Sequence, residues 1–86
     1  MSTHKSHPQI IARLKRANGH LLKIISMLET ECSCVDIAQQ LQAVEKAIAN
    51  AKKTLVHDHI DHCLEDAVLT QAEEAIEQFK EITKYL

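Results

Sequence analysis

The chain has 86 residues, of which 45% are apolar, with one glycine, one proline, no tryptophan and two aromatic side chains, Phe79 and Tyr85. Strands are built mainly from β-branched and aromatic residues, so a chain rich in Ala, Leu and Ile with so few aromatics is predicted to be all-α. The net charge of −2 argues, as an average, against a nucleic acid as partner, and no segment has the roughly 18 consecutive apolar residues of a membrane span.

The first predicted helix covers residues 8–29. Pro8 suits the first turn of a helix, where its missing N–H needs no partner. Apolar residues then recur at steps of three, four and seven, which predicts one buried stripe: Ile11, Leu14, Leu21, Ile25 and Leu28. A second stripe, expected to stay in solvent, consists of Arg13, Arg16, His20 and Lys23. Gly19 costs such a helix about 1 kcal/mol relative to Ala, so we expect another backbone to approach it closely.

The second predicted helix follows a turn at residues 30–33 and covers residues 34–64. Its apolar positions are spaced by four and three in alternation, as in a heptad seam: Ile37, Leu41, Val44, Ile48, Ala51 and Leu55. At 1.5 Å per residue the helix is roughly 45 Å long, and it therefore needs a partner along its whole length.

The third predicted helix covers residues 70–86 and is amphipathic, with Thr70 and Glu73 resembling a capping box at its start. Residues 1–86 are expected to form one three-helix domain, with residues 1–7 as a flexible N-terminal arm. A domain of this size buries only about 60% of its unfolded surface, so oligomerisation or a bound metal would stabilise it.

The numbers of cysteines and histidines call for a chemical explanation. The sequence begins without a signal-peptide core, so a cytoplasmic location is expected; there an odd count of three cysteines favours ligand or redox chemistry over structural disulfides. Six histidines are about three times what average usage predicts. His59 and Cys63 are four residues apart and share one helix face, and with Cys34 they form a set that suits Cu(I), Zn(II) or Ni(II). The competing interpretation is a buried cysteine beside a surface histidine.

The separation of Cys34 from Cys63 decides how such a set can assemble. They are 29 residues apart, roughly 43 Å along a continuous helix, so they cannot bind one ion within a single chain. Antiparallel pairing of two such helices, about a two-fold axis near Ala47 and Ile48, brings Cys34 of one chain beside His59 and Cys63 of the other. The symmetry predicts two equivalent intersubunit sites per dimer.

The same residues carry a family resemblance. The pattern Arg13-Leu14-Lys15-Arg16 with Gly19, the run from Cys34 to Val44, and the spacings of His59 and Cys63 resemble the CsoR/RcnR/FrmR family of bacterial repressors over nearly the whole chain. This resemblance implies a three-helix protomer whose antiparallel dimer assembles into a disc-shaped tetramer, a dimer of dimers. It also implies a repressor that binds operator DNA without effector and releases it with effector, which derepresses metal efflux or detoxification genes.

The resemblance also narrows the choice of effector. Cys34, His59 and Cys63 correspond to the triad of the Cu(I) sensors, and three such ligands favour trigonal Cu(I). Some nickel sensors add an N-terminal histidine, for which His4 or His7 is the candidate here, and a fourth ligand would favour Ni(II) or Co(II). The formaldehyde-responsive members have glutamate at the position of Cys63, which disfavours that branch. The persulfide-responsive members share the pair of cysteines, so a thiol- or persulfide-responsive repressor remains an alternative.

Other residues around this set have supporting or open roles. Cys32 is open to three interpretations: a further group at the site, a disulfide partner, or a small buried residue. His57 and His62 are expected to be solvated or to lie behind the ligands. The acidic third helix is expected to cover the site and to offer a carboxylate from Glu73, Glu74 or Glu77.

Charge is unevenly distributed along the chain. Residues 1–28 hold five basic side chains and no acidic one, whereas residues 58–86 hold eight acidic side chains against two lysines, a local net charge of −6. No helix-turn-helix or zinc-finger pattern is visible, so DNA is expected to meet a basic surface, largely through its phosphates. The expected DNA contacts are Arg13, Lys15, Arg16, His20, Lys23, Lys52 and Lys53; family members have basic residues at the positions of Arg13 and Lys53.

Two other classes of function compete with a repressor. A cytosolic metal carrier would need the ligands but not the basic surface. An enzyme is disfavoured, because three helices leave no room for a substantial substrate pocket and the sequence offers no oxyanion loop. Neither an organic cofactor nor a membrane partner is expected.

Overall fold

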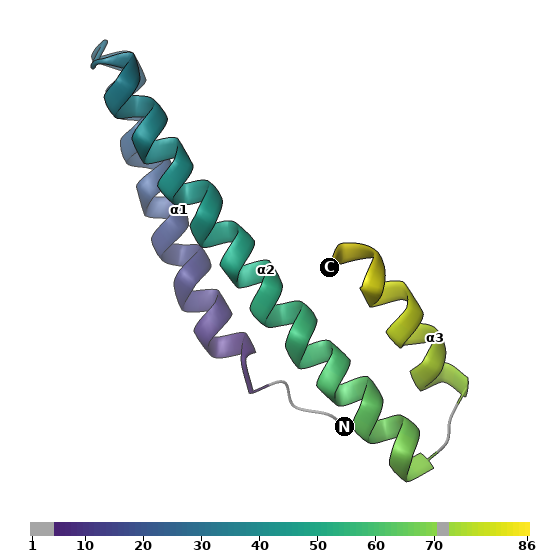
Figure 1. Ribbon diagram of the computed structural model, residues 1–86. Helices are drawn as coiled ribbons and strands as arrows, with labels where there is room; N and C mark the ends of the chain where they lie inside the picture. The colour runs from purple at the N-terminus through teal and green to yellow at the C-terminus, as the bar shows by residue number, and fades with distance from the viewer. Residues whose placement is uncertain (1–4, 71–72) are drawn as a thin grey trace.

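The structure, a computed structural model, describes residues 5–70 and 73–86, and every regular element within them is helical (Figure 1). Helix α1 spans His7–Glu29, α2 spans Cys34–Thr70 and α3 spans Glu73–Ile82, and a short 3₁₀ helix, η1, follows at Thr83–Tyr85. The predicted all-α, three-helix protomer is confirmed for the described residues. None of their helices is both long enough and apolar enough to cross a membrane.

The second helix extends six residues beyond the predicted end at residue 64. Residues 65–70 contain neither glycine nor proline, so nothing in the sequence stops the helix earlier. Thr70 is the last residue of α2 and α3 begins at Glu73, so the prediction that Thr70 starts the third helix is wrong. Helix α3 is accordingly shorter than predicted, at 10 residues.

The turn between α1 and α2 makes these two helices antiparallel. The Glu31 N–H donates to the Leu28 carbonyl at 3.2 Å, and the Cys32 N–H donates to the Met27 carbonyl at 3.0 Å. This pair of bonds is the Schellman arrangement, which needs a left-handed residue at the position of Glu31. Glu31 has a φ of 56°, a conformation that glycine adopts without steric cost.

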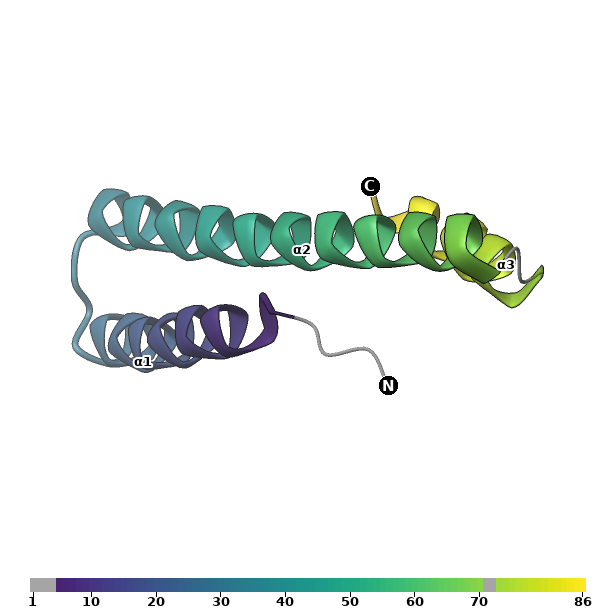
Figure 2. The ribbon, with the colours of Figure 1, turned by 90° about the horizontal axis from the view of Figure 1, so that it is seen from below.

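Buried side chains form a narrow line between the helices. Ile24, Ile37 and Val44 form the centre of this line, and Met27 packs against them. Farther along α2, where α3 lies against it, Val56, Cys63 and Ala75 are buried (Figure 1). Figure 2 shows α1 and α3 against different faces of α2, so α2 is the common scaffold for both.

The single chain is elongated. It measures 56 × 22 × 13 Å, and its radius of gyration is 17.7 Å, compared with about 12 Å for a compact domain of this length. Its accessible surface is 6756 Å², whereas a compact monomer of this mass would expose roughly 5,100 Å². The protomer thus leaves much more surface in water than its size requires.

Much of this excess surface is apolar, and it includes the stripe that the sequence predicted to be buried in the first helix. Ile11 is 52% exposed and Leu28 is 57% exposed, whereas the residues of α1 buried in the single chain are Ile10, Ala17 and Ile24. The predicted seam of α2 is half buried and half exposed in the single chain. Its first, third and fifth members are buried, and the others are exposed: Leu41, Ile48 and Leu55. Within one protomer, the predicted seam of α2 is therefore half covered, whereas none of the five residues of the predicted stripe in α1 is buried.

Gly19 is also exposed in the single chain. A Cβ atom placed there would meet nothing within 4 Å. The close backbone approach predicted at this glycine therefore does not occur within one protomer.

Candidate functional site

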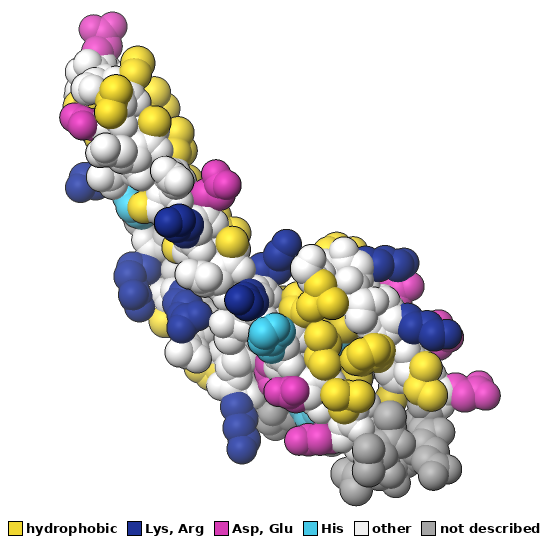
Figure 3. Space-filling view, in the orientation of Figure 1, with side chains coloured by type: hydrophobic (Ala, Val, Ile, Leu, Met, Phe, Trp, Pro, Cys, Tyr) yellow, Lys and Arg dark blue, Asp and Glu magenta, His cyan; other side chains and the backbone are white. Residues whose placement is uncertain are grey.

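A basic groove of about 450 Å³ lies between α1 and α2. Helix α1 contributes Arg13, Arg16 and His20 to its lining, and α2 contributes Asn50, Lys53 and Thr54. Figure 3 shows Lys and Arg side chains gathered over the middle of this helical hairpin. The antiparallel pairing thus adds Lys53 to the stripe of α1, although the two parts are far apart in sequence.

Three hydrogen bonds hold side chains of the basic groove in place. Arg13 Nη1 donates to Thr54 Oγ1 at 3.2 Å, and the Thr54 hydroxyl itself donates to the Asn50 carbonyl at 3.0 Å. His20 Nε2 and Gln40 Oε1 are 2.5 Å apart. Arg13 and His20 are half-buried rather than fully in solvent as predicted, because each reaches across to α2.

The other predicted DNA contacts lie outside the lining of this groove. Lys15 and Lys23 are exposed on α1, and Lys52 is exposed on α2. Lys52 and Lys53 instead share a smaller groove of about 210 Å³ with His57 and Tyr85. The structure therefore brings Arg13, Arg16, His20 and Lys53 together, and leaves the other three at its margins.

The predicted metal ligands lie toward opposite ends of α2. Ser33 is at the N-cap position, where its carbonyl accepts the Ile37 N–H at 3.0 Å, and Cys34 follows as the first residue of the helix. The Cys34 side chain is exposed. His59 and Cys63 lie roughly 40 Å away along the helix axis, so the separation expected from the sequence holds in an unbroken α2.

His59 and Cys63 lie on the part of α2 that α3 covers. Cys63 is only 3% exposed. His59 lines a groove of about 360 Å³ between α2 and α3, together with Glu77, Glu81 and Tyr85. Of the three carboxylates proposed from the sequence, Glu77 is in this lining and Glu73 and Glu74 are not.

The ligand set is incomplete in one chain. Among the described residues of a single protomer, no three Cys, His, Asp or Glu side chains come together in a way that could hold a metal. The donor chemistry nevertheless fits a soft or borderline ion, because a buried thiol and an imidazole lie one helical turn apart and an exposed thiol is available to a neighbour.

The start of α1 lies beside the His59 region of the same chain. Ser6 precedes α1, and its hydroxyl donates to Asp58 Oδ2 at 2.5 Å. His7 is the first residue of α1 and is exposed. His4 lies outside the described residues.

Cys32 is exposed in the turn before α2, so it is not the small buried residue that was one of its three interpretations. Its Sγ atom lies 3.5 Å from the hydroxyl oxygen of Thr30.

Several residues of these sites were not found by sequence reasoning. Asn50 and Thr54 line the basic groove, and Gln40 pairs with His20 of that lining; each position depends on how α1 and α2 meet, which no local spacing signals. The position of Glu81 could have been predicted from the sequence, because Glu81 is four residues after Glu77 and so lies on the same helix face.

Comparisons with known proteins show which family the chain belongs to. A family model described as metal-sensitive transcriptional repressor matches residues 6–85. The copper-sensing transcriptional repressor CsoR of Bacillus subtilis (strain 168) is 40% identical over 85 residues, which cover 93% of this chain and 84% of that protein. CsoR of Mycobacterium ulcerans (strain Agy99) is 39% identical over 74 residues, which cover 85% of this chain and 63% of that protein. The chain thus spans less than two thirds of the length of this mycobacterial relative.

The fold is also that of a known regulator. The nickel-responsive transcriptional regulator InrS superimposes with a TM-score of 0.84 over the whole chain and 99% of its own, at 23% sequence identity. The match to the family model over residues 6–85 assigns the chain to the class of metal-sensitive transcriptional repressors. The chain belongs to this class as a member of the CsoR/RcnR/FrmR family, as the sequence pattern indicated.

Proposed function

We propose that this protein is a metal-responsive transcriptional repressor that works as an oligomer. Without effector it binds operator DNA, and it releases the DNA when a metal binds between two chains. The operator-bound form is a tetramer built from two antiparallel dimers. Release derepresses genes for metal efflux or detoxification.

The observation that carries the proposal is the division of one ligand set between the two parts of a continuous helix. Cys34 is exposed at the start of α2, and Cys63 is buried 29 residues later, beside His59. A second chain in antiparallel orientation supplies the metal ligands that each end of α2 lacks. The exposed apolar residues between them, Leu41, Ile48 and Leu55, offer a surface for that second chain.

The proposed effector is Cu(I), held by Cys34 of one protomer and by His59 and Cys63 of its partner. Two thiolates and an imidazole suit this soft ion in trigonal coordination. Ni(II) or Co(II) is the alternative effector, and it requires a fourth ligand. His7 is the proposed fourth ligand. The hydrogen bond from Ser6 to Asp58 supports this role, because it fixes the start of α1 next to the turn that precedes His59.

The proposed DNA surface is the basic groove and its margins. Arg13, Arg16 and Lys53 are grouped there, and the bond to Thr54 restricts Arg13 to one side of the groove. Phosphate contacts of this kind give affinity that depends steeply on salt. A tetramer repeats the groove four times, so several basic grooves can contact DNA together although the net charge of each chain is negative.

Mixing two defective chains tests the intersubunit site directly. Cys34→Ala and Cys63→Ala homodimers each lack a thiolate at both sites, whereas a heterodimer contains one intact site and one that lacks two thiolates. Co-refolded chains are expected to recover one high-affinity Cu(I) site per heterodimer, measured by anaerobic competition with a chromophoric chelator. Recovery of no site would refute the arrangement.

A gel-shift titration tests the regulatory role and the effector together. The probe is a duplex from the region upstream of the protein's own gene, and the titrants are Cu(I), Ni(II), Co(II), Zn(II) and persulfide under anaerobic conditions. Release by Cu(I) at the lowest free concentration is expected. Release by nickel or cobalt alone would assign the four-ligand alternative, release by persulfide alone would assign a thiol sensor, and absence of DNA binding would favour a metal carrier.

A further inference from the structure

Two neighbouring grooves share a single side chain, that of Tyr85. The groove of about 360 Å³ between α2 and α3 is lined by His59, by the acidic face of α3 and by Tyr85. The groove of about 210 Å³ contains Lys52, Lys53 and His57 from α2, with Tyr85 and Leu86. Tyr85 thus shares one groove with a proposed metal ligand and the other groove with two proposed DNA-binding lysines.

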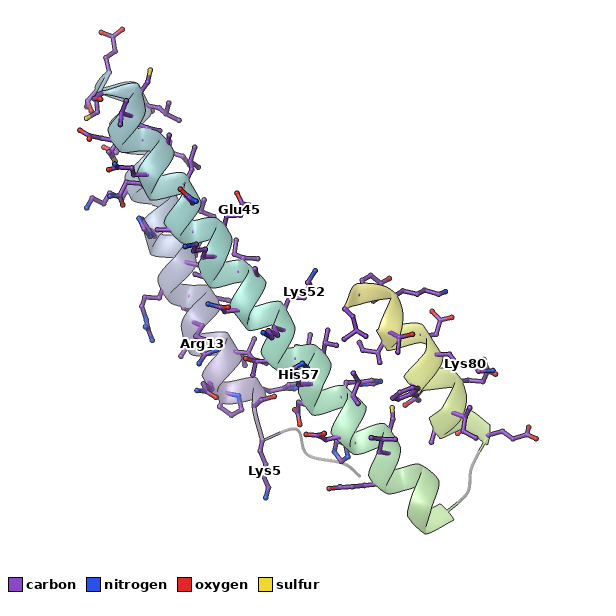
Figure 4. All side chains as sticks on the ribbon, viewed as in Figure 1. Lys5, Arg13, Glu45, Lys52, His57 and Lys80 are labelled. Atoms are coloured by element: carbon purple, nitrogen blue, oxygen red, sulfur yellow. The ribbon has the colours of Figure 1, made fainter. Side chains whose placement is uncertain are left out.

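The path of the chain after α3 explains this position. Helix α3 folds back along α2, so its C-terminal end reaches the middle of α2 rather than its end (Figure 1). There Tyr85 is the last residue of the 3₁₀ turn η1, with Leu86 N–H donating to the Thr83 carbonyl at 3.3 Å. Lys52 extends from α2 on the side where this end of α3 lies (Figure 4).

One further residue completes a continuous line through the protomer. Lys53 lines the groove next to Tyr85 and also the basic groove that contains Arg13 and Arg16. His59 and Tyr85 line one groove, Tyr85 and Lys53 line the next, and Lys53 and Arg13 line the third, so the three grooves follow one another through shared residues within one chain. No step of this line needs a residue of the partner.

We propose that Tyr85 is a positioning residue that couples the metal site to the DNA surface. The inference rests on the proposed function and adds a route by which effector binding changes the basic surface. When His59 turns toward a metal, the contents of its groove rearrange, and the Tyr85 ring shifts with them. The ring then packs differently against the aliphatic stems of Lys52 and Lys53, which moves their ammonium groups relative to DNA phosphates.

Tyr85 is suited to such a role because it lines two grooves and is not part of the buried core. Its side chain is 58% exposed, so replacing it removes little buried surface. Substitution therefore changes communication between the two grooves far more than it changes folding, metal binding or DNA binding taken alone.

The test measures coupling in Tyr85→Ala, with anaerobic Cu(I) as the probe and the upstream duplex as DNA. Coupling is the ratio of DNA dissociation constants with and without saturating Cu(I), for which allosteric proteins typically show about 5- to 150-fold. In Tyr85→Ala this ratio is expected to fall by about threefold or more, with the affinities for DNA alone and Cu(I) alone within about twofold of wild type. Because coupling is reciprocal, the effect of DNA on Cu(I) affinity falls by the same factor.

Two matched controls separate coupling from loss of packing. Gln78→Ala changes only the lining of the His59 groove, and Leu86→Ala changes only the lining of the lysine groove. Both are expected to keep wild-type coupling within about twofold. Wild-type coupling in Tyr85→Ala, or an equal loss in both controls, would overturn the inference while leaving the proposed function intact. A wild-type protein that shows no metal-dependent release of DNA would overturn both.

Discussion

Ser6 Oγ donates a hydrogen bond of 2.5 Å to Asp58 Oδ2, joining residues 52 positions apart. The bond fixes the start of α1 against the turn of α2 that directly precedes His59. Ser6 makes no side-chain capping bond to α1, so its contact with Asp58 is independent of how the helix begins. The first histidine of α1, His7, is thereby held next to the region where the metal is proposed to bind.

Loss of the Ser6 hydroxyl is expected to weaken the binding of four-coordinate metals selectively. In Ser6→Ala the affinity for Ni(II) or Co(II) should fall about fivefold, since a hydrogen bond of this kind contributes about 1 kcal/mol. The affinity for three-coordinate Cu(I) should stay within about twofold. Chelator competition measures both. Ser26→Ala, on the same helix, is the control, and equal losses for both metals would show that the arm has no ligand role.

Arg13 is expected to bind a DNA phosphate. Arg13→Ala should weaken operator binding and lower the slope of log affinity against log salt by about 0.9 for each phosphate that the side chain neutralises. Thr54→Val keeps the charge and removes the bond of 3.2 Å to the guanidinium, so affinity should fall less and the slope should not change. Fluorescence anisotropy across a salt series measures both quantities.

Lys84→Ala is the matched control for Arg13→Ala. It removes the same charge from η1, where Lys84 pairs with Glu81 of α3 at 3.2 Å. An Arg13→Ala protein that keeps the slope of the Lys84→Ala protein would contradict the assignment of the groove to DNA.

A single substitution in the turn at Glu31 should increase the stability of the protein. Glu31 occupies the left-handed position of the Schellman turn with a φ of 56°, which glycine adopts without strain. Glu31→Gly is therefore expected to raise the free energy of unfolding by about 0.5 to 1 kcal/mol. Urea denaturation followed by circular dichroism, at one fixed protein concentration, gives the value. Ala12→Gly, at an exposed position inside α1, should lower stability by about 1 kcal/mol, and a gain there would invalidate the comparison.

The exposed apolar face of α2 is expected to hold the oligomer together. Ile48 is 44% exposed in the single chain, and burial of an unpaired carboxylate at this position would be strongly unfavourable. Ile48→Asp should therefore dissociate the oligomer in sedimentation experiments and abolish the intersubunit Cu(I) site with it. Gln42→Asp adds the same charge elsewhere on α2 and should leave the assembly intact. An Ile48→Asp protein with the wild-type mass would place the interface elsewhere.

Much of this protein follows from its sequence alone. Its composition predicts helices only, and the periods of three and four residues place the first helix within one residue at its start. The 29 residues between Cys34 and Cys63 exclude a site within one continuous helix. These features were accessible because the rise and the angular period of a helix follow directly from residue number. The end of α2 was missed because no residue marks it.

Which neighbour covers each face depends on the tertiary structure. Periodicity gives the angle of Leu41 or Val44 around its own helix, but the burial of Val44 and the exposure of Leu41 depend on where α1 lies. The bond from Ser6 to Asp58, the tether from Arg13 to Thr54, and the position of Tyr85 between two grooves have the same origin. Each joins residues on different helices, and the crossing of helices is set by packing over the whole hairpin rather than by any local spacing.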